Sequence, residues 1–190
     1  NLPAQSTPFV GREVELTQIG DLLSNPDCRL LSLLGLGGIG KSRLAAEFER
    51  WVDLQPLGAC RFHAAAAEGL SGTPYALLRD LFASRFSILE SDSAAQARQK
   101  LEEGLSAYLE DDAEVKAHVI GALLGFEAAG LADKDDPQQL RQQALFYLQG
   151  YFTALAEASP LLLVFDDIHW ADGPSLNAIR ELVRRCRGSR

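Results

Sequence analysis

The sequence predicts an α/β fold that has a parallel sheet core and a large helical insertion, and three observations lead to this prediction. An apolar run, residues 30–34, is followed by the glycine-rich segment GLGGIGKS and an amphipathic segment. A second apolar run, residues 161–165, ends in two aspartates. Between them, apolar residues recur at helical spacing from about residue 70 to 159. Strands connected through helical segments favour a parallel sheet, because parallel strands need long crossovers.

Residues 35–42 match the pattern of a P-loop, GxxxxGK followed by Ser or Thr. Glycines allow backbone N–H groups to face phosphate oxygens, and the N-terminus of the following helix adds partial positive charge. The pattern predicts a bound nucleoside triphosphate, with Lys41 on the β- and γ-phosphates and Ser42 on Mg²⁺. The residues expected to hold the nucleotide here are Gly35, Gly37, Gly38, Ile39, Gly40, Lys41, Ser42 and Arg43.

A Rossmann dinucleotide site is a remote alternative for the same glycines. Gly35, Gly37 and Gly40 also spell GxGxxG. That motif requires an acidic residue about 20 residues on, at the end of the next strand. The expected second strand, residues 59–64, ends in His63 and Ala64 instead, which favours the P-loop.

A helix is predicted on each side of the glycine loop. Glu13 and Glu15 favour a helix start, because acidic side chains are stabilised near a helix N-terminus. Both segments then show apolar residues at helical spacing. These faces consist of Leu16, Ile19 and Leu23 before the loop, and of Leu44, Ala45, Phe48, Trp51 and Val52 after it.

Four further helices are predicted within the insertion, residues 70–159. Thr73 and Pro74 are expected to cap the first, Ser93 the second, and Asp136 with Pro137 the fourth. The apolar faces are expected to be Leu78, Leu81, Phe82 and Phe86; Ala97, Leu101, Leu105 and Tyr108; Val115, Val119, Leu123 and Leu124; and Leu140, Ala144, Leu148, Phe152 and Leu155. Such an insertion is far longer than the single helix that one βαβ crossover requires.

Residues 161–167 have the pattern of a Walker B strand. An unbroken apolar run suits a buried parallel strand, and a carboxylate at its carboxyl end lies beside the phosphates. Asp166 is expected to anchor Mg²⁺, and Asp167 is the candidate general base. An extended strand would point the two side chains to opposite faces. A last helix is expected to start near residues 172–175.

Composition indicates a cytoplasmic, soluble module. The 190 residues are 47% hydrophobic and 23% charged, and no apolar run approaches the ~20 residues of a membrane span. Three cysteines without CxxC spacing indicate reduced thiols and no metal site. A net charge of −8 argues against direct nucleic-acid binding. Because methionine is absent and Asn1 comes first, we expect the sequence to be a piece of a longer protein. Residues 1–8 are expected to be a linker or the edge of the piece, and residues 9–190 the N-terminal part of one P-loop NTPase domain.

Two segments, FVGRE at residues 9–13 and LLLVFDDIHWAD at residues 161–172, together with GLGGIGKS, resemble the STAND branch of AAA-like P-loop NTPases. Modules of this branch are similar to those of large LuxR-type bacterial transcriptional activators and of soluble adenylyl cyclases. The resemblance implies ATP-dependent switches that respond to an inducer and often self-associate. By the resemblance, Val10 and Gly11 lie against the adenine, Arg12 lies near the nucleotide, and His169 and Trp170 lie behind the Walker B carboxylates. For the last two, a buried core position is the alternative.

The expected function is that of a Mg-ATP-binding regulatory switch in a multidomain bacterial signalling or transcriptional regulator, partnered by other domains of the longer chain. ATP is preferred to GTP because no NKxD-like motif is present. The sequence stops after the helix that follows the Walker B strand, before the further strands and sensor residues that the resemblance implies. Efficient hydrolysis is therefore not expected of this fragment, and slow hydrolysis is expected of the full-length protein. The alternatives are an AAA-type motor or initiator, and a non-hydrolysing interaction module that nucleotide only stabilises.

Overall fold

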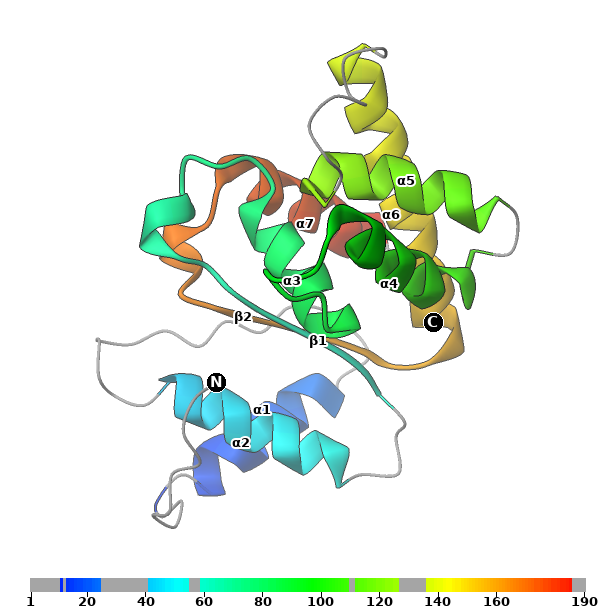
Figure 1. Ribbon diagram of the computed structural model, residues 1–190. Coiled ribbons are helices and arrows are strands. Elements are labelled where there is room, and N and C mark those ends of the chain that lie inside the picture. Colours follow the sequence, from blue (N-terminus) through cyan, green and yellow to red (C-terminus); the bar gives the residue numbers. More distant parts are fainter. Residues whose placement is uncertain are drawn as a thin grey trace. The chain divides into compact units, whose positions relative to one another are not determined.

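The computed structural model describes residues 11, 13–24, 41–54, 59–109, 112–126 and 136–185. The chain divides into two compact units, Asn1–Gly58 and Ala59–Arg190, each described here by itself (Figure 1). The first unit contains α1 (Glu13–Ser24) and α2 (Lys41–Asp53), where the sequence predicts helices. The strand predicted at residues 30–34 lies outside the described residues.

The apolar faces predicted for α1 and α2 are confirmed in part, and the side chain of Leu23 lies outside the described residues. Ile19 in α1 and Leu44 and Phe48 in α2 are buried. Trp51 differs from the prediction because it is 40% exposed, although its ring stacks on Phe48 with centroids 5.6 Å apart.

The second unit contains a two-stranded parallel sheet within its described residues. Strand β1 (Cys60–Ala65) pairs with β2 (Leu161–Asp166) in a register that places Cys60 opposite Leu161 and Ala65 opposite Asp166. Both strands lie within one residue of the predicted bounds. Parallel pairing of these distant segments brings their carboxyl ends to the same edge of the sheet.

Helices fill the chain between the strands and after β2. The 3₁₀ turn η1 (Glu68–Leu70) follows β1, and η2 (Ile168–Trp170) follows β2. The helices of this unit are α3 (Ala76–Phe86), α4 (Ala94–Ser106), α5 (Ala113–Leu124), α6 (Pro137–Ala158) and α7 (Gly173–Arg185). Helix α3 packs on β1 and also contacts α4, α5 and α7. Helix α4 packs on α5, α5 on α6, and α6 on α7 (Figure 1). None of the helices described is long and apolar enough to cross a membrane.

Two of the predicted helix starts are confirmed by their hydrogen bonds. Ser93 opens α4 with a capping box, in which its hydroxyl accepts from the Gln96 backbone and its backbone N–H donates to the Gln96 side chain at 2.9 Å. Asp136 opens α6, where its carboxylate accepts from the Gln138 backbone at 3.0 Å and Pro137 takes the first helical position.

Two local predictions were wrong. Thr73 and Pro74 do not cap α3; Tyr75 precedes the helix in a left-handed conformation with φ 63° and makes no side-chain cap. Along α5, Val115 is 53% exposed. The buried face of α5 consists of Ala117, Ile120, Gly121 and Leu124. Leu124 was predicted on this face and is buried as expected. The rest of the face differs because α5 packs against both α4 and α6, where small residues permit close approach.

An aromatic cluster joins the sheet to the helices at the centre of the second unit. Phe62 of β1 meets Phe82 of α3 with centroids 6.1 Å apart, and meets Phe152 of α6 at 5.3 Å. Tyr151 lies 6.1 Å from Phe82. All four side chains are essentially inaccessible to solvent, so this cluster anchors β1 and the edge where it ends.

Gly104 in α4 is expected to tolerate alanine poorly, because a Cβ there would overlap the Phe86 ring. Overpacking of this kind costs about 1–3 kcal/mol and outweighs the ~1 kcal/mol gained by replacing glycine in a helix. Gly150 of α6 has open space around its Cβ position. Urea unfolding should therefore show Gly104→Ala destabilised and Gly150→Ala stabilised. Equal gains at both positions would contradict the packing at Phe86.

Candidate functional site at the carboxyl edge of the sheet

Asp166 is the last residue of β2, at the edge where both strands end. Its side chain is 21% exposed, and its Oδ2 atom lies 3.5 Å from Nε2 of His63 in β1. The sequence alone drew attention to His63 only because a Rossmann site would need an acidic residue near this strand end. The pairing of β1 with β2 places this imidazole beside Asp166, the carboxylate predicted to anchor Mg²⁺. No local pattern could reveal this contact.

Asp167 lies outside the strand, which corrects one expectation about the two carboxylates. It adopts a left-handed conformation with φ 51° and ψ 35°, and its carbonyl accepts the Trp170 N–H at 2.9 Å. The two aspartates are therefore separated by a turn and not by the alternation of an extended strand. Asp167 is exposed. A non-glycine residue held in this region carries backbone strain, which is frequent at functional sites.

His169 and Trp170 form the exposed surface of η2. Their rings lie 4.9 Å apart at 44°, and Trp170 is 37% exposed. The buried alternative considered for both side chains was therefore wrong. Both rings are exposed and follow Asp166 and Asp167 directly in the chain.

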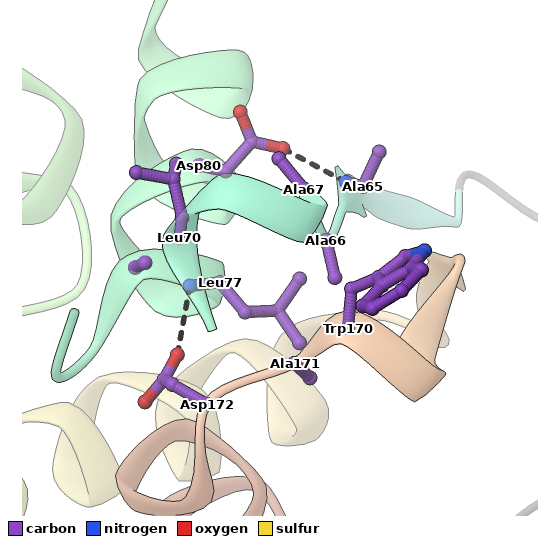
Figure 2. A pocket seen from close by; sticks show the side chains of 10 residues that line it. Ala65, Ala66, Ala67, Leu70, Leu77, Asp80, Trp170, Ala171 and Asp172 are labelled. Atoms are coloured by element: carbon purple, nitrogen blue, oxygen red, sulfur yellow. Dashed lines mark hydrogen bonds between the residues drawn. The ribbon is translucent and has the colours of Figure 1, made fainter. Parts of the chain in front are cut away.

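Asp172 is a buried carboxylate that joins this turn to α3. Its Oδ1 accepts the backbone N–H groups of Tyr75 and Ser175, each at 2.8 Å. Its Oδ2 accepts the backbone N–H of Leu77 at 3.2 Å (Figure 2). The Ser175 hydroxyl accepts the Leu78 N–H at 3.3 Å. One carboxylate, only 2% exposed, thus satisfies helix-start donors of both α3 and α7.

The pKa of Asp172 reflects this set of donors. Burial alone would raise the pKa of this carboxyl. Hydrogen bonds from the Ser175 side chain and from the backbone of Ser175, Leu77 and Tyr75 outweigh burial and hold the pKa below its ordinary value. The sequence predicts a helix start near this residue. It does not predict the backbone N–H donors at the start of α3, which lie nearly a hundred positions away in the chain.

A small pocket of about 100 Å³ opens between the end of β1, α3 and η2 (Figure 2). Ala65, Leu77 and Trp170 are among its apolar walls. Asp80 also lines it, and its Oδ2 accepts the Ala65 N–H at 2.8 Å. Ligand pockets usually measure about 300–1,000 Å³, so this one is too small for a nucleotide.

The P-loop half of the predicted site is described only from its helix onward. Helix α2 begins at Lys41, and its first turn carries Ser42 and Arg43 but no acidic residue. A helix N-terminus presents unpaired backbone N–H groups and partial positive charge to an anion. The predicted residues outside the described ones are Val10, Arg12, Gly35, Gly37, Gly38, Ile39 and Gly40. Gly11 is described, exposed, with φ 87°.

The donor chemistry fits magnesium bound together with a nucleotide. Mg²⁺ prefers oxygen ligands and takes only one or two protein carboxylates when phosphates supply others. In the second unit, Asp166 carries a carboxylate at the strand end. In the first unit, taken by itself, Ser42 carries a hydroxyl in the first turn of α2. In the part of the chain that the structure describes, no group of three or more His, Cys, Asp or Glu gathers as a metal site.

Comparison with known proteins identifies the family. A protein of Rhizobium meliloti (strain 1021), described as uncharacterized, is 27% identical over 183 residues, which are 93% of this chain and 17% of that relative. The chain therefore spans about a sixth of the relative's length. No solved structure matches the chain. A family model described as "AAA ATPase domain" matches residues 8–188. The likeness to AAA-like P-loop ATPases is thereby confirmed, the STAND branch stays a prediction, and the chain belongs to the AAA ATPase domain family.

Proposed function

We propose that this chain is the Mg-ATP-binding switch module of a multidomain bacterial signalling or transcriptional regulator, with slow ATP hydrolysis in the full-length protein. Membership in the AAA ATPase domain family supports a nucleotide-binding module of ATPase type. Lys41 contacts the β- and γ-phosphates, Ser42 and Asp166 hold Mg²⁺, and Asp167 activates the attacking water. The glycine loop, with Val10, Gly11, Arg12 and Arg43, surrounds the nucleotide.

The observation that carries the proposal is the start of α2 at Lys41, directly after GLGGIG. A glycine loop that opens a helix can direct several backbone N–H groups at phosphate oxygens. Without an acid in its first turn, α2 keeps the positive potential of its N-terminus. Lysine at this point supplies a full positive charge to the same phosphates.

The regulatory role is supported by the size of the relative. This chain matches only 17% of the Rhizobium protein, as expected for a module that works with other domains of one longer chain. Self-association is part of the proposal, because ATPase switches of the STAND branch, which the sequence resembles, often self-associate. The inducer acts on another domain in this scheme.

Lys41→Ala is expected to abolish most Mg-ATP binding, since the triphosphate loses its principal charged partner. A ligand at about 100 times its dissociation constant stabilises a two-state fold by about 2.7 kcal/mol. Thermal unfolding with and without Mg-ATP should therefore show a clear shift for the wild type and little shift for Lys41→Ala.

Arg50→Ala is the matched control, because Arg50 lies in the last turn of the same helix and pairs with Glu47 at 3.0 Å. It should retain the full ATP-dependent shift. If the wild type and Lys41→Ala respond identically to saturating Mg-ATP, the proposed nucleotide site is wrong.

A further inference from the structure

His63 and Asp166 meet on one face of the sheet, and the strand register explains how. His63 lies opposite Val164, and Asp166 follows Val164 by two residues. Side chains two apart on a strand share a face. The imidazole therefore lies diagonally across from the carboxylate, with Nε2 3.5 Å from Oδ2.

The backbone of Asp166 is held at the strand end, because its carbonyl accepts the Ala66 N–H at 3.0 Å. This bond does not orient the carboxylate, whose direction depends on side-chain contacts. Among the described residues, His63 is the side chain within ion-pair distance of this carboxylate. His63 is 38% exposed and Asp166 is 21% exposed, so the pair lies at the surface of the sheet edge.

Asp166 can bind Mg²⁺ well only if one oxygen is presented in a defined direction, because Mg²⁺ demands near-octahedral geometry. A donor that contacts one carboxylate oxygen leaves the second oxygen for the ion. Partners of this kind behind metal-binding carboxylates and imidazoles typically contribute 10–100-fold to metal affinity. A histidine in its Nε2–H tautomer is such a donor.

We propose that His63 is a positioning residue for the magnesium site: its Nε2–H holds Oδ2 of Asp166, which would leave Oδ1 for the Mg²⁺ that accompanies ATP. This inference rests on the proposed function, because it concerns the Mg²⁺ that the nucleotide brings. It adds a residue of β1 to a site that the sequence assigned only to the P-loop and the Walker B strand.

The test measures ATP binding by calorimetry in the full-length protein, first in EDTA and then across a series of Mg²⁺ concentrations at one pH. His63→Ala is expected to leave binding in EDTA unchanged. It should raise the Mg²⁺ concentration for half-maximal enhancement of ATP binding by about 10-fold or more. The side-chain amide of His63→Gln can also donate an N–H. This variant should therefore need a Mg²⁺ concentration close to that of the wild type for half-maximal enhancement.

Arg61→Ala is the matched control, because Arg61 lies on the same strand and face, two residues farther from the edge. It should show wild-type Mg²⁺ dependence. The positioning role would be overturned if His63→Ala needed the same Mg²⁺ concentration as the wild type for half-maximal enhancement of ATP binding, or a lower one. It would also be overturned if His63→Ala and His63→Gln raised this concentration equally. Absence of ATP binding by the wild type at every Mg²⁺ concentration would instead overturn the proposed function. Thermal unfolding of each variant shows whether a weaker Mg²⁺ response comes from a destabilised fold or from weaker Mg²⁺ binding.

Discussion

Replacing Asp172 with alanine is expected to lower the free energy of unfolding by about 3–5 kcal/mol, because the change removes the acceptor of three buried backbone N–H groups. Hydrogen bonds to charged groups contribute about 1.5–3 kcal/mol each, and unsatisfied buried donors cost about 1–3 kcal/mol. Tyr75 adds to the loss, since its left-handed backbone, with φ 63°, persists only while its surroundings hold it.

Chemical denaturation followed by circular dichroism measures this effect. Asp136→Ala is the matched control, because Asp136 also caps a helix but is exposed, and loss of such a cap costs about 1 kcal/mol. Asp172→Asn should fall between the two, since its amide retains one acceptor and turns an N–H₂ group toward a backbone donor. A loss at Asp172 no larger than that at Asp136 would show that the carboxylate does not hold α3 to α7.

The same carboxylate should make stability depend on pH in the acid range. Because the pKa of Asp172 is lower in the folded protein than its ordinary value, ionised Asp172 favours the folded state. This contribution is fully present above the unfolded pKa of about 3.9 and is lost as the pH falls through the folded pKa. Wild-type stability should therefore fall more steeply below about pH 4 than that of Asp172→Asn.

Replacing Asp167 with asparagine is expected to slow ATP hydrolysis by the full-length protein about 10²–10⁴-fold, the usual contribution of a general base. ATP binding should remain nearly intact. Asp167 is exposed and lies in the turn directly after β2, outside the paired strand. In a switch protein this change would trap the ATP-bound state.

Asp166→Asn is the matched comparison, because the two aspartates are adjacent but occupy different backbone conformations. It should weaken ATP binding only when Mg²⁺ is present, since the ion loses an anionic ligand. Titrations with and without Mg²⁺, followed by measurement of phosphate release, separate the two roles. Equal binding losses at both positions would show that the roles are assigned wrongly.

Local sequence determined much of the second unit. Residues 161–166 form a strand because a short apolar run followed by acids favours a strand end, and Ser93 and Asp136 start helices through hydrogen bonds to residues two or three positions away. The family also follows from sequence alone, because the model match rests on residues 8–188. In each case the residues that predict the element lie within it or within a few positions of it.

Contacts between distant segments were decided only by the tertiary structure. The His63–Asp166 pair depends on the parallel register of two strands about a hundred residues apart. The Asp172 carboxylate binds donors on α3, and the buried face of α5 depends on the helices on either side of it. The sequence by itself determined most of the described helices and strands, and it predicts the positions along the chain at which phosphate and magnesium would bind. Only the packing decided which side chains lie beside those positions, because such neighbours are set by distance in space and leave no periodic or local pattern.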